Sequence, residues 1–236
     1  MPKVSVCMAT YNGERFVEKQ LNSILSQLEK DDEVIISDDS STDNTLQIIK
    51  QFNDPRISLY PFQKFRNAVF NFENAINKSS GDIIFLADQD DLWHEEKVKV
   101  MCQELLTYDL VVCDSTIIDE SENVIGNSYF ELINSGPGLF KNFKSNTYLG
   151  CCIAFKRGVI NKALPFPKDI PMHDIWFGFV AELFYKVKFI PQKLHAYRKH
   201  ENNLTDSSTG LSRYHLMQKI KFRINLIKYL PLLIFR

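Results

Sequence analysis

The chain has 236 residues, of which 44% are hydrophobic and 24% are charged. This length and composition suit one globular domain with a complete hydrophobic core, and no linker marks a second domain. The formal net charge is −1, and we expect no nucleic-acid partner. No uninterrupted apolar stretch reaches the ~18 residues that a membrane-spanning helix needs.

The cysteines and the N-terminus indicate a cytoplasmic chain. The five cysteines form no C-x-x-C pair and have no histidine at zinc-site spacing. Three of them lie in apolar runs, so we expect buried, reduced thiols. Met1 leads directly into a strand-like run, without the basic and apolar regions of a secretory signal.

Short apolar runs alternate with segments of helical period in the first half of the chain. The predicted strands are Val4–Ala9, Val34–Ile36, Ile57–Tyr60, Ile83–Ala87 and Leu110–Cys113. The predicted helices have apolar faces within Val17–Leu28, Leu46–Phe52 and Val98–Leu105. This alternation predicts an α/β fold with a mostly parallel sheet and helices on both faces. Ligands of such sheets bind beyond the carboxyl ends of the strands.

The second half is less regular. The region from about Gly126 to Gly150 is rich in Gly, Asn and Ser, and it is predicted to be a long loop. Cys151–Phe155 is predicted to be a strand, Ile175–Phe184 a helix and Val187–Ile190 a strand.

The last 30 residues differ from the rest in charge. All 29 acidic residues lie at or before Asp206, whereas six of the 28 basic residues follow it. We therefore predict a domain at 1–206 and a basic amphipathic helical tail at 207–236. Apolar residues repeat there at helical spacing: Leu216, Ile220, Ile224, Ile227 and Leu230. Pro231 is expected to end or kink the helix. The tail can dock on the domain with its basic face in solvent, or lie on an anionic membrane surface.

Three polar segments follow predicted strands: Ala9–Gly13, Ser37–Asp43 and Ala87–Trp93. Parallel strands would bring them to one edge of the sheet. The second and third are rich in carboxylates, which repel one another unless a cation or hydrogen-bond donors compensate. Mg²⁺ typically binds between one or two carboxylates and substrate phosphates. Each segment alone is also typical of a turn or a helix cap, so the inference depends on all three.

These segments resemble successive motifs of the family 2 glycosyltransferases, which have the GT-A fold. Met172–Trp176 resembles that family's catalytic-base segment, and Tyr197–Asn203 resembles the C-terminal motif of its bacterial rhamnosyltransferase-like members. The resemblance covers about residues 3 to 205. It implies a nucleotide-sugar-binding part at 1–114 and an acceptor and catalytic-base part at 115–206.

The resemblance implies a role for several residues of the first part. Thr10 and Tyr11 would line the nucleobase pocket, and Asp39 would accept a hydrogen bond from the base. Asp88 would lie near the ribose and the metal. Asp90 would be the main protein ligand of Mg²⁺ or Mn²⁺.

Further roles are implied in the second part. Asp174 would be the general base, and His200 would reach the metal or the diphosphate. Arg198 suits a phosphate through its planar donor fork, or it forms a buried structural ion pair. His173 is interpreted as a structural residue rather than the base.

The sequence departs from the family pattern at two places. Ser40 replaces a glycine that is common in the second motif. Arg66–Asn71 lacks the glycine and the Ala-Arg-Asn often found there, so no donor-binding arginine is assigned in that segment.

The resemblance implies inverting, divalent-metal-dependent transfer of a sugar from a nucleoside-diphosphate sugar to a hydroxyl of a bacterial surface glycan, such as O-antigen or capsule. The leading donor is dTDP-L-rhamnose. The expected acceptor is a lipid-linked saccharide at the inner face of the cell membrane. A galactosyl- or N-acetylhexosaminyltransferase of the same pathway is an alternative, and so is a non-catalytic nucleotide- or glycan-binding module. A sugar nucleotidyltransferase would need a glycine-rich N-terminal loop, and residues 9–20 contain one glycine.

Overall fold

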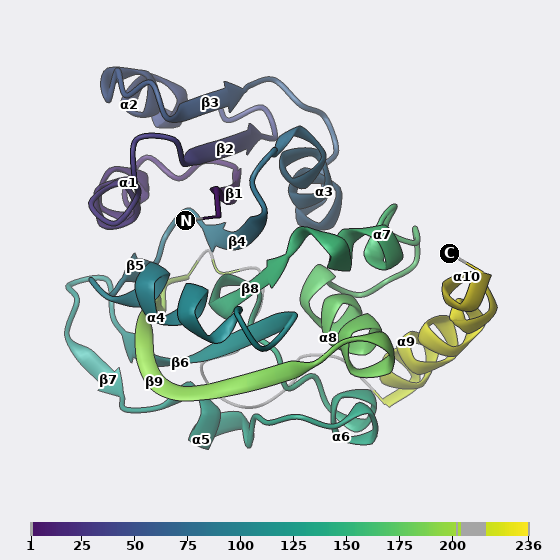
Figure 1. The fold of residues 1–236 in the computed structure, drawn as a ribbon. Helices are drawn as coiled ribbons and strands as arrows, with labels where there is room; N and C mark the ends of the chain where they lie inside the picture. Colours follow the sequence, from purple (N-terminus) through teal and green to yellow (C-terminus); the bar gives the residue numbers. More distant parts are fainter. Residues whose placement is uncertain (1, 202, 204–215, 236) are drawn as a thin grey trace.

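The computed structural model describes residues 2–201, 203 and 216–235 (Figure 1). The predicted boundary between residues 206 and 207 lies outside the described residues, as do Arg213 and His215.

The first half alternates strands and helices as predicted. Its strands are β1 (Val4–Thr10), β2 (Glu33–Asp38), β3 (Ile57–Tyr60), β4 (Ile83–Asp88) and β5 (Leu92–Trp93). Its helices are α1 (Val17–Leu25), α2 (Thr45–Gln51), α3 (Ala68–Lys78) and α4 (Lys97–Glu104). Helix α3 was not predicted. It begins after Asn67, whose side chain accepts a hydrogen bond from the Val69 amide, and it buries Phe72 and Ile76 against the sheet.

The second half contains more structure than predicted. Its strands are β6 (Leu110–Ile118), β7 (Val124–Gly126), β8 (Ile153–Lys156) and β9 (Val187–Arg198). Its helices are α5 (Tyr129–Ile133), α6 (Leu139–Lys144), α7 (Ile160–Ala163), α8 (His173–Phe184), α9 (Leu216–Lys228) and α10 (Leu230–Phe235), with 3₁₀ turns η1 (Gly150–Cys152) and η2 (Arg157–Val159). The predicted long loop is therefore wrong in part, because α5 and α6 lie within it. Helices of fewer than two turns are too short to give a periodic apolar pattern.

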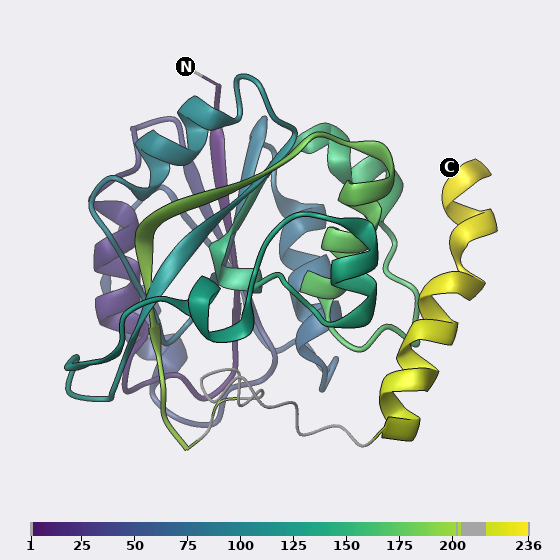
Figure 2. The same cartoon turned by 90° about the horizontal axis from the view of Figure 1, so that it is seen from below.

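The strands form one mixed sheet in the order β3-β2-β1-β4-β8-β6-β9-β5, with β7 paired to β6. The first four strands in this order are parallel, as predicted. Strand β8 is antiparallel to both β4 and β6, and β5 is antiparallel to β9. Helices cover both faces: α1 and α4 lie on one side of the sheet, and α3 and α8 on the other (Figures 1 and 2).

The centre of the sheet is a continuous apolar layer. Val6, Cys7 and Met8 of β1 are fully buried, as expected for a parallel strand with a helix layer on each face. All five cysteines are free thiols, and four of them are buried. Because the centre of the sheet is apolar, the polar side chains of the site lie in the loops that follow the strands.

The tail docks on the domain. Leu226 and Leu233 are buried, and the Tyr229 ring packs edge-on against Trp176 of α8 at 6.1 Å between centroids. Arg223 Nε donates to the Phe143 carbonyl at the end of α6 at 2.8 Å. These contacts support the docked arrangement of the tail.

The basic side chains of the docked tail divide between solvent and the domain, because Lys221 and Lys228 are exposed and Arg223 is only partly exposed. Arg223 contacts α6, and Lys228 forms a 3.1 Å ion pair with Asp169. The exposed side chains include an apolar set: Met217, Ile220, Ile224, Ile227, Leu232, Ile234 and Phe235. Pro231 lies in the first turn of α10, where its missing N–H costs nothing. No helix among the described residues has the length and hydropathy required to cross a membrane.

Candidate active site

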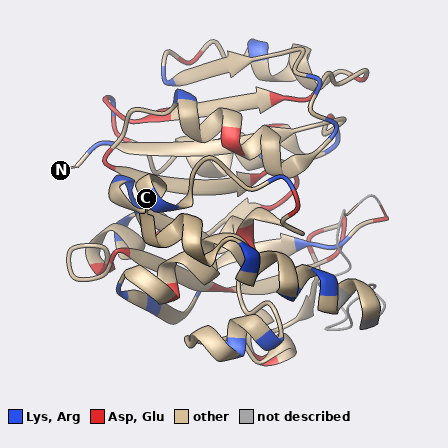
Figure 3. Cartoon of the chain, turned by 90° about the vertical axis from the view of Figure 1, so that its right-hand side faces the viewer, with Lys and Arg blue, Asp and Glu red and all other residues tan. Residues whose placement is uncertain are grey.

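The loops after β1, β2 and β4 meet at one edge of the sheet, as predicted. The Tyr11 amide donates to Gln89 Oε1 at 2.8 Å, and Gln89 Nε2 donates to the Tyr11 carbonyl at 2.9 Å. The Asn12 amide donates to Ser41 Oγ at 2.9 Å. Figure 3 shows acidic residues in the loops that follow the strands. Direct hydrogen bonds therefore fix the three segments relative to one another.

The three residues assigned to the nucleobase pocket are in different environments. Tyr11 is 57% exposed and can present its ring to a ligand. Thr10 is buried and its hydroxyl donates to Asp38 at 2.8 Å, so a contact from this hydroxyl to a base would require breaking that bond. Asp39 accepts from the Phe65 amide at 2.7 Å and thereby holds the segment before α3.

Ser40 accounts for the first departure from the family pattern. Its φ of 65° lies in the left-handed region, where glycine is favoured. Its hydroxyl donates to the Gln63 carbonyl, which stabilises this conformation from the side chain. The turn is therefore retained without the glycine.

The two predicted metal ligands lie together. His200 Nε2 is 2.7 Å from Asp90 Oδ2, and both side chains are mostly buried. Burial raises the pKa of Asp90, and the hydrogen bond from His200 opposes that rise. His200 also lines an open cavity of about 380 Å³ with Asp119, Glu120 and Lys199.

The donor set fits a divalent ion. An ion bound by both side chains would replace the 2.7 Å hydrogen bond between His200 Nε2 and Asp90 Oδ2, and it would need only a small movement, because two neighbouring ligands with bonds of about 2.1 Å lie about 3 Å apart. Burial raises the pKa of Asp88, and the charges of Asp91, Asp90 and Asp174 raise it further. A cation would relieve this repulsion and stabilise the ionised carboxylates.

The contacts of Arg198 suit the structural role that the sequence left as the alternative. Its side chain is almost completely buried. Nε donates to the Asp90 carbonyl at 2.7 Å, and a second guanidinium nitrogen forms a 3.3 Å ion pair with Glu122. The guanidinium also lies over the Phe16 ring, 4.9 Å from its centroid. These contacts hold the main chain of the acidic loop, residues 88–91 at the end of β4, and favour the structural alternative. The contact of Arg198 with the diphosphate stays a prediction.

Asp174 lies in the first turn of α8, with 9% of its surface exposed. Burial raises its pKa to about 6, although hydrogen bonds from Asn146 Nδ2 (2.8 Å) and the Ile175 amide lower it. A carboxylate with this pKa is ionised at neutral pH and accepts protons better than an exposed one. The geometry and the pKa suit a general base.

His173 is unsuited to proton transfer. It is buried against Phe72, with ring centroids 4.2 Å apart, and burial lowers its pKa to about 3. Neither ring nitrogen has a hydrogen-bond partner among the described residues. His173 is therefore a neutral packing residue beside Asp174, in agreement with its interpretation from the sequence.

Two residues of the site were not predicted. Gln89 lies within the third motif, and its position between two aspartates is the only signal that could have identified it. Asn146 lies in the predicted loop, 28 positions before the carboxylate to which it donates, and no local pattern indicates that contact.

Comparisons with known proteins agree in family and fold. The sequence model of Glycosyl transferase family 2 matches residues 5–164. The chain is 34% identical over 217 residues to the dTDP-rhamnosyl transferase RfbG of Shigella flexneri, covering 83% of this chain and 72% of RfbG.

Two solved structures have the same fold at low sequence identity. S. aureus TarS 1–349 in complex with UDP-GlcNAc aligns with a TM-score of 0.69 at 18% identity, covering 95% of this chain and 71% of that one. The mannosyltransferase PcManGT from Pyrobaculum calidifontis, in complex with GDP-Man and Mn²⁺, aligns with a TM-score of 0.67 at 20% identity, covering 86% of this chain and 58% of that one. The chain thus spans less than two thirds of the mannosyltransferase.

The raised pKa of Asp174 predicts a pH-dependent gain in stability for Asp174→Asn. The pKa of Asp174 is about 6 in the folded protein and 3.8 for an unperturbed aspartate, so the proton stabilises the fold and this contribution is lost as pH rises through about 6. At pH 8 the amide variant should be more stable than the wild type by up to about 3 kcal/mol, and roughly half of this gain should remain at pH 5. Urea unfolding of both proteins at the two pH values measures the difference.

Asp31→Asn is the matched control, because Asp31 is exposed. It should change the free energy of unfolding by less than ~0.5 kcal/mol at either pH. An Asp174→Asn protein that is no more stable than the wild type at pH 8 would contradict the raised pKa.

Proposed function

The chain belongs to glycosyltransferase family 2, and from this membership we propose that it transfers a sugar from a nucleoside-diphosphate sugar with inversion, assisted by a divalent metal. The proposed donor is dTDP-L-rhamnose, supported by the similarity to RfbG. The proposed acceptor is a hydroxyl of a lipid-linked bacterial surface glycan. A galactosyl or N-acetylhexosaminyl donor is the alternative within the same class.

One observation carries this proposal. Asp174 lies in the first turn of α8, next to His173, which packs against Gly150 of η1, and η1 leads into β8, the neighbour of β4 in the sheet. The charge of Asp174 also raises the pKa of Asp88, at the end of β4. The candidate base therefore lies close to the acidic loop where a donor diphosphate and its ion would bind. A non-catalytic binding module has no need for a base at that position.

The residues divide the proposed reaction between them. Asp90 and His200 would hold the ion, which when bound supplies Lewis-acid stabilisation of the negative charge on the departing diphosphate. Asp174 would accept the proton of the acceptor hydroxyl as that oxygen attacks C1 from the face opposite the diphosphate. Asn146 orients the Asp174 carboxylate through its 2.8 Å hydrogen bond. A single displacement of this kind inverts the anomeric centre.

The first test combines donor identity with metal dependence. Purified protein is incubated with dTDP-rhamnose, UDP-galactose and UDP-N-acetylhexosamines, and release of nucleoside diphosphate is measured. We expect release with dTDP-rhamnose, its loss in excess EDTA, and recovery with Mn²⁺ or Mg²⁺. Asp90→Asn should prevent recovery, because an amide is a weaker ligand than a carboxylate for a hard cation.

Glu95→Gln is the control for charge, because Glu95 is an exposed acid on the segment after β5. It should behave as the wild type. Full wild-type activity in excess chelator would exclude the metal role, and release from a different sugar nucleotide would replace the proposed donor.

The second test concerns the base. Asp174→Asn keeps the shape of the side chain but cannot accept the proton, so turnover should fall by ~10²–10⁴ while nucleoside-diphosphate binding, measured by calorimetry, is retained. A variant with more than a tenth of wild-type turnover would show that Asp174 is not the base.

The pH profile of turnover provides a second readout of the same base. Wild-type turnover should decrease as the pH falls through about 6, because Asp174 becomes protonated. Asn146 donates a hydrogen bond that lowers this pKa, so Asn146→Ala should move the midpoint to higher pH. A shift to lower pH would contradict the assignment.

The proposed membrane contact is supported by the orientation of the tail. A helix that docks with its opposite face in water normally buries its apolar residues and exposes its charged ones. Here Arg223 makes a docking contact, while Ile220, Ile224 and Ile227 are about half exposed, and the basic Lys221 and Lys228 are exposed as well. The outer side of α9 and α10 carries no acidic residue (Figure 3). An apolar stripe of this kind suits the interface of an anionic leaflet, where a lipid-linked acceptor would be held.

The membrane test uses surface substitutions, because removing the tail would uncover the buried contact of Tyr229 with Trp176. The triple variant Ile220→Gln, Ile224→Gln, Ile227→Gln should no longer float with phosphatidylglycerol vesicles, whereas the wild type should float and be partly released by salt. Val124→Gln with Ile125→Gln replaces exposed apolar residues of β7 and serves as the control. Equal flotation of wild type and triple variant would exclude the stripe as the contact surface.

A further inference from the structure

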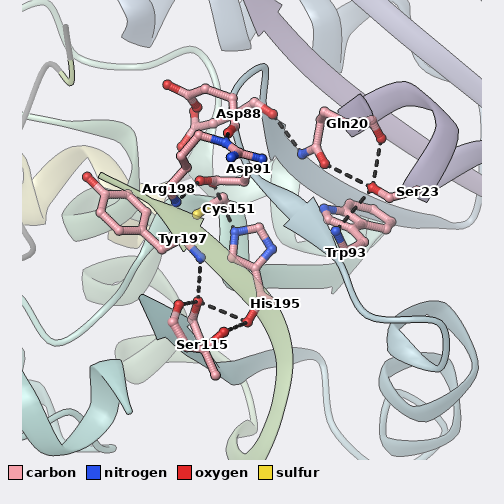
Figure 4. A network of polar contacts seen from close by, with 12 residues as sticks. Gln20, Ser23, Asp88, Asp91, Trp93, Ser115, Cys151, His195, Tyr197 and Arg198 are labelled. Atoms are coloured by element: carbon pink, nitrogen blue, oxygen red, sulfur yellow. Dashed lines mark hydrogen bonds and ion pairs between the residues drawn. The ribbon is translucent and has the colours of Figure 1, made fainter. Parts of the chain in front are cut away.

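A buried carboxylate lies directly beside the proposed metal ligand. Asp91 follows Asp90 in the loop between β4 and β5, and its side chain is fully buried. One carboxylate oxygen accepts from the Arg198 amide at 2.8 Å, and the other is 2.9 Å from His195 Nε2. Both partners belong to β9, so Asp91 joins the acidic loop to the strand that leads to His200 (Figure 4).

The opposite side of the His195 ring contacts a buried lysine. Lys97 Nζ is 3.0 Å from His195 Nδ1, donates to the Cys151 carbonyl at 2.7 Å and lies 4.3 Å from the centroid of the Trp93 ring. An ammonium group has no acceptor, so Nδ1 accepts and the proton on Nε2 is donated to Asp91. Burial lowers the pKa of His195 to about 4, which is consistent with this neutral ring.

The result is an ion pair bridged by a neutral imidazole. Lys97 and Asp91 are both fully buried, and isolated charges in such positions are strongly unfavourable. Each is stabilised by polar partners within the chain, and the aromatic face of Trp93 adds a cation–π contact to Lys97. Both Asp91 oxygens and the Lys97 ammonium have protein partners, which favours structural support over direct contact with a substrate.

The network connects the two halves of the site. On the Asp91 side, the β9 main chain continues to Arg198, whose Nε holds the Asp90 carbonyl at 2.7 Å. On the Lys97 side, the Cys151 carbonyl belongs to η1. In the same turn, a Cβ at Gly150 would lie 2.5 Å from His173 Nε2, so η1 packs directly against the start of α8, where Asp174 lies.

We propose that Lys97, His195 and Asp91 form a positioning relay that holds Asp90 and His200 at the spacing required by the divalent ion. The relay also fixes this pair relative to the start of α8, which carries Asp174. The relay rests on the proposed function, because it supports the same metal site. It assigns a role in metal affinity to two residues, Lys97 and His195, that do not contact the ion.

Replacement of Lys97 distinguishes positioning from simple electrostatics, because the two effects would change metal affinity in opposite directions. Lys97→Met removes a positive charge near a cation site, and through-space repulsion alone predicts tighter metal binding. If the lysine acts by positioning, its loss weakens metal binding. Partners that orient metal ligands typically change affinity by 10- to 100-fold when they are replaced.

The experiment measures binding of Mn²⁺ alone to the full chain, from the electron paramagnetic resonance signal of free Mn²⁺. We expect Lys97→Met to weaken binding by at least tenfold. Lys99→Met is the matched control, because Lys99 is exposed two residues along the same helix, and it should bind as the wild type. Circular dichroism and thermal unfolding identify variants that fail to fold.

Two substitutions of His195 test the bridge without removing a buried charge. His195→Gln keeps an N–H that reaches Asp91, so it should bind Mn²⁺ within threefold of the wild type. His195→Asn is shorter and loses that contact, so it should weaken binding by at least tenfold. If Lys97→Met does not fold, these two His195 variants test whether the relay affects Mn²⁺ affinity.

The outcomes distinguish the relay from the proposed function. Wild-type protein that binds no Mn²⁺ overturns the metal site itself and the relay with it. Wild-type protein that binds Mn²⁺, together with a folded Lys97→Met variant of equal or higher affinity, overturns the relay alone. Equal affinity of folded His195→Asn and His195→Gln also overturns it.

Discussion

The concentration of negative charge at the end of β4 is the constraint on which the rest of the site depends. Asp88, Asp90 and Asp91 lie within four residues, and burial and repulsion by neighbouring carboxylates raise the pKa of Asp88 and Asp90. Burial also opposes ionisation of Asp91, but His195 and the Arg198 amide outweigh it and lower the pKa of that carboxyl. The fold gives two of them different partners: His195 and a backbone amide for Asp91, and His200 for Asp90. Strand β9 supplies the first set of partners and leads directly to His200, so a single strand organises the acidic loop.

Asp174, on α8, is likewise a buried carboxylate whose pKa depends on its hydrogen-bond partners. Asp174 lies in the first turn of α8, where the helix dipole favours a carboxylate, but burial outweighs this effect and raises its pKa. Asn146 limits the rise and fixes the orientation of the carboxylate. Strand β8 lies between β4 and β6 in the sheet and follows η1, so the main chain that packs against the start of α8 also borders the acidic loop.

The tail shows that tertiary contacts decide which side chains of an amphipathic helix are covered. Basic residues without acidic neighbours suggest a solvated basic face, yet Arg223 is used to hold carbonyl groups at the end of α6. The apolar positions divide between two faces, with Leu226 and Leu233 buried and Ile224 and Ile227 exposed. Helical spacing identifies such a segment as amphipathic, but only packing decides which face turns inward.

The sequence by itself determined the parallel strands, the order of the polar segments and their meeting at one edge, because apolar periodicity and strand ends are local properties of the chain. The family resemblance of their motifs also predicted that Asp90 and His200 belong to one site. Only the tertiary structure decided that Arg198 supports the acidic loop, that Asn146 holds Asp174, and that Lys97, His195 and Asp91 share one buried network. These contacts join residues 28 to 108 positions apart, and they depend on burial and on which side of the sheet each side chain faces. No local pattern carries that information.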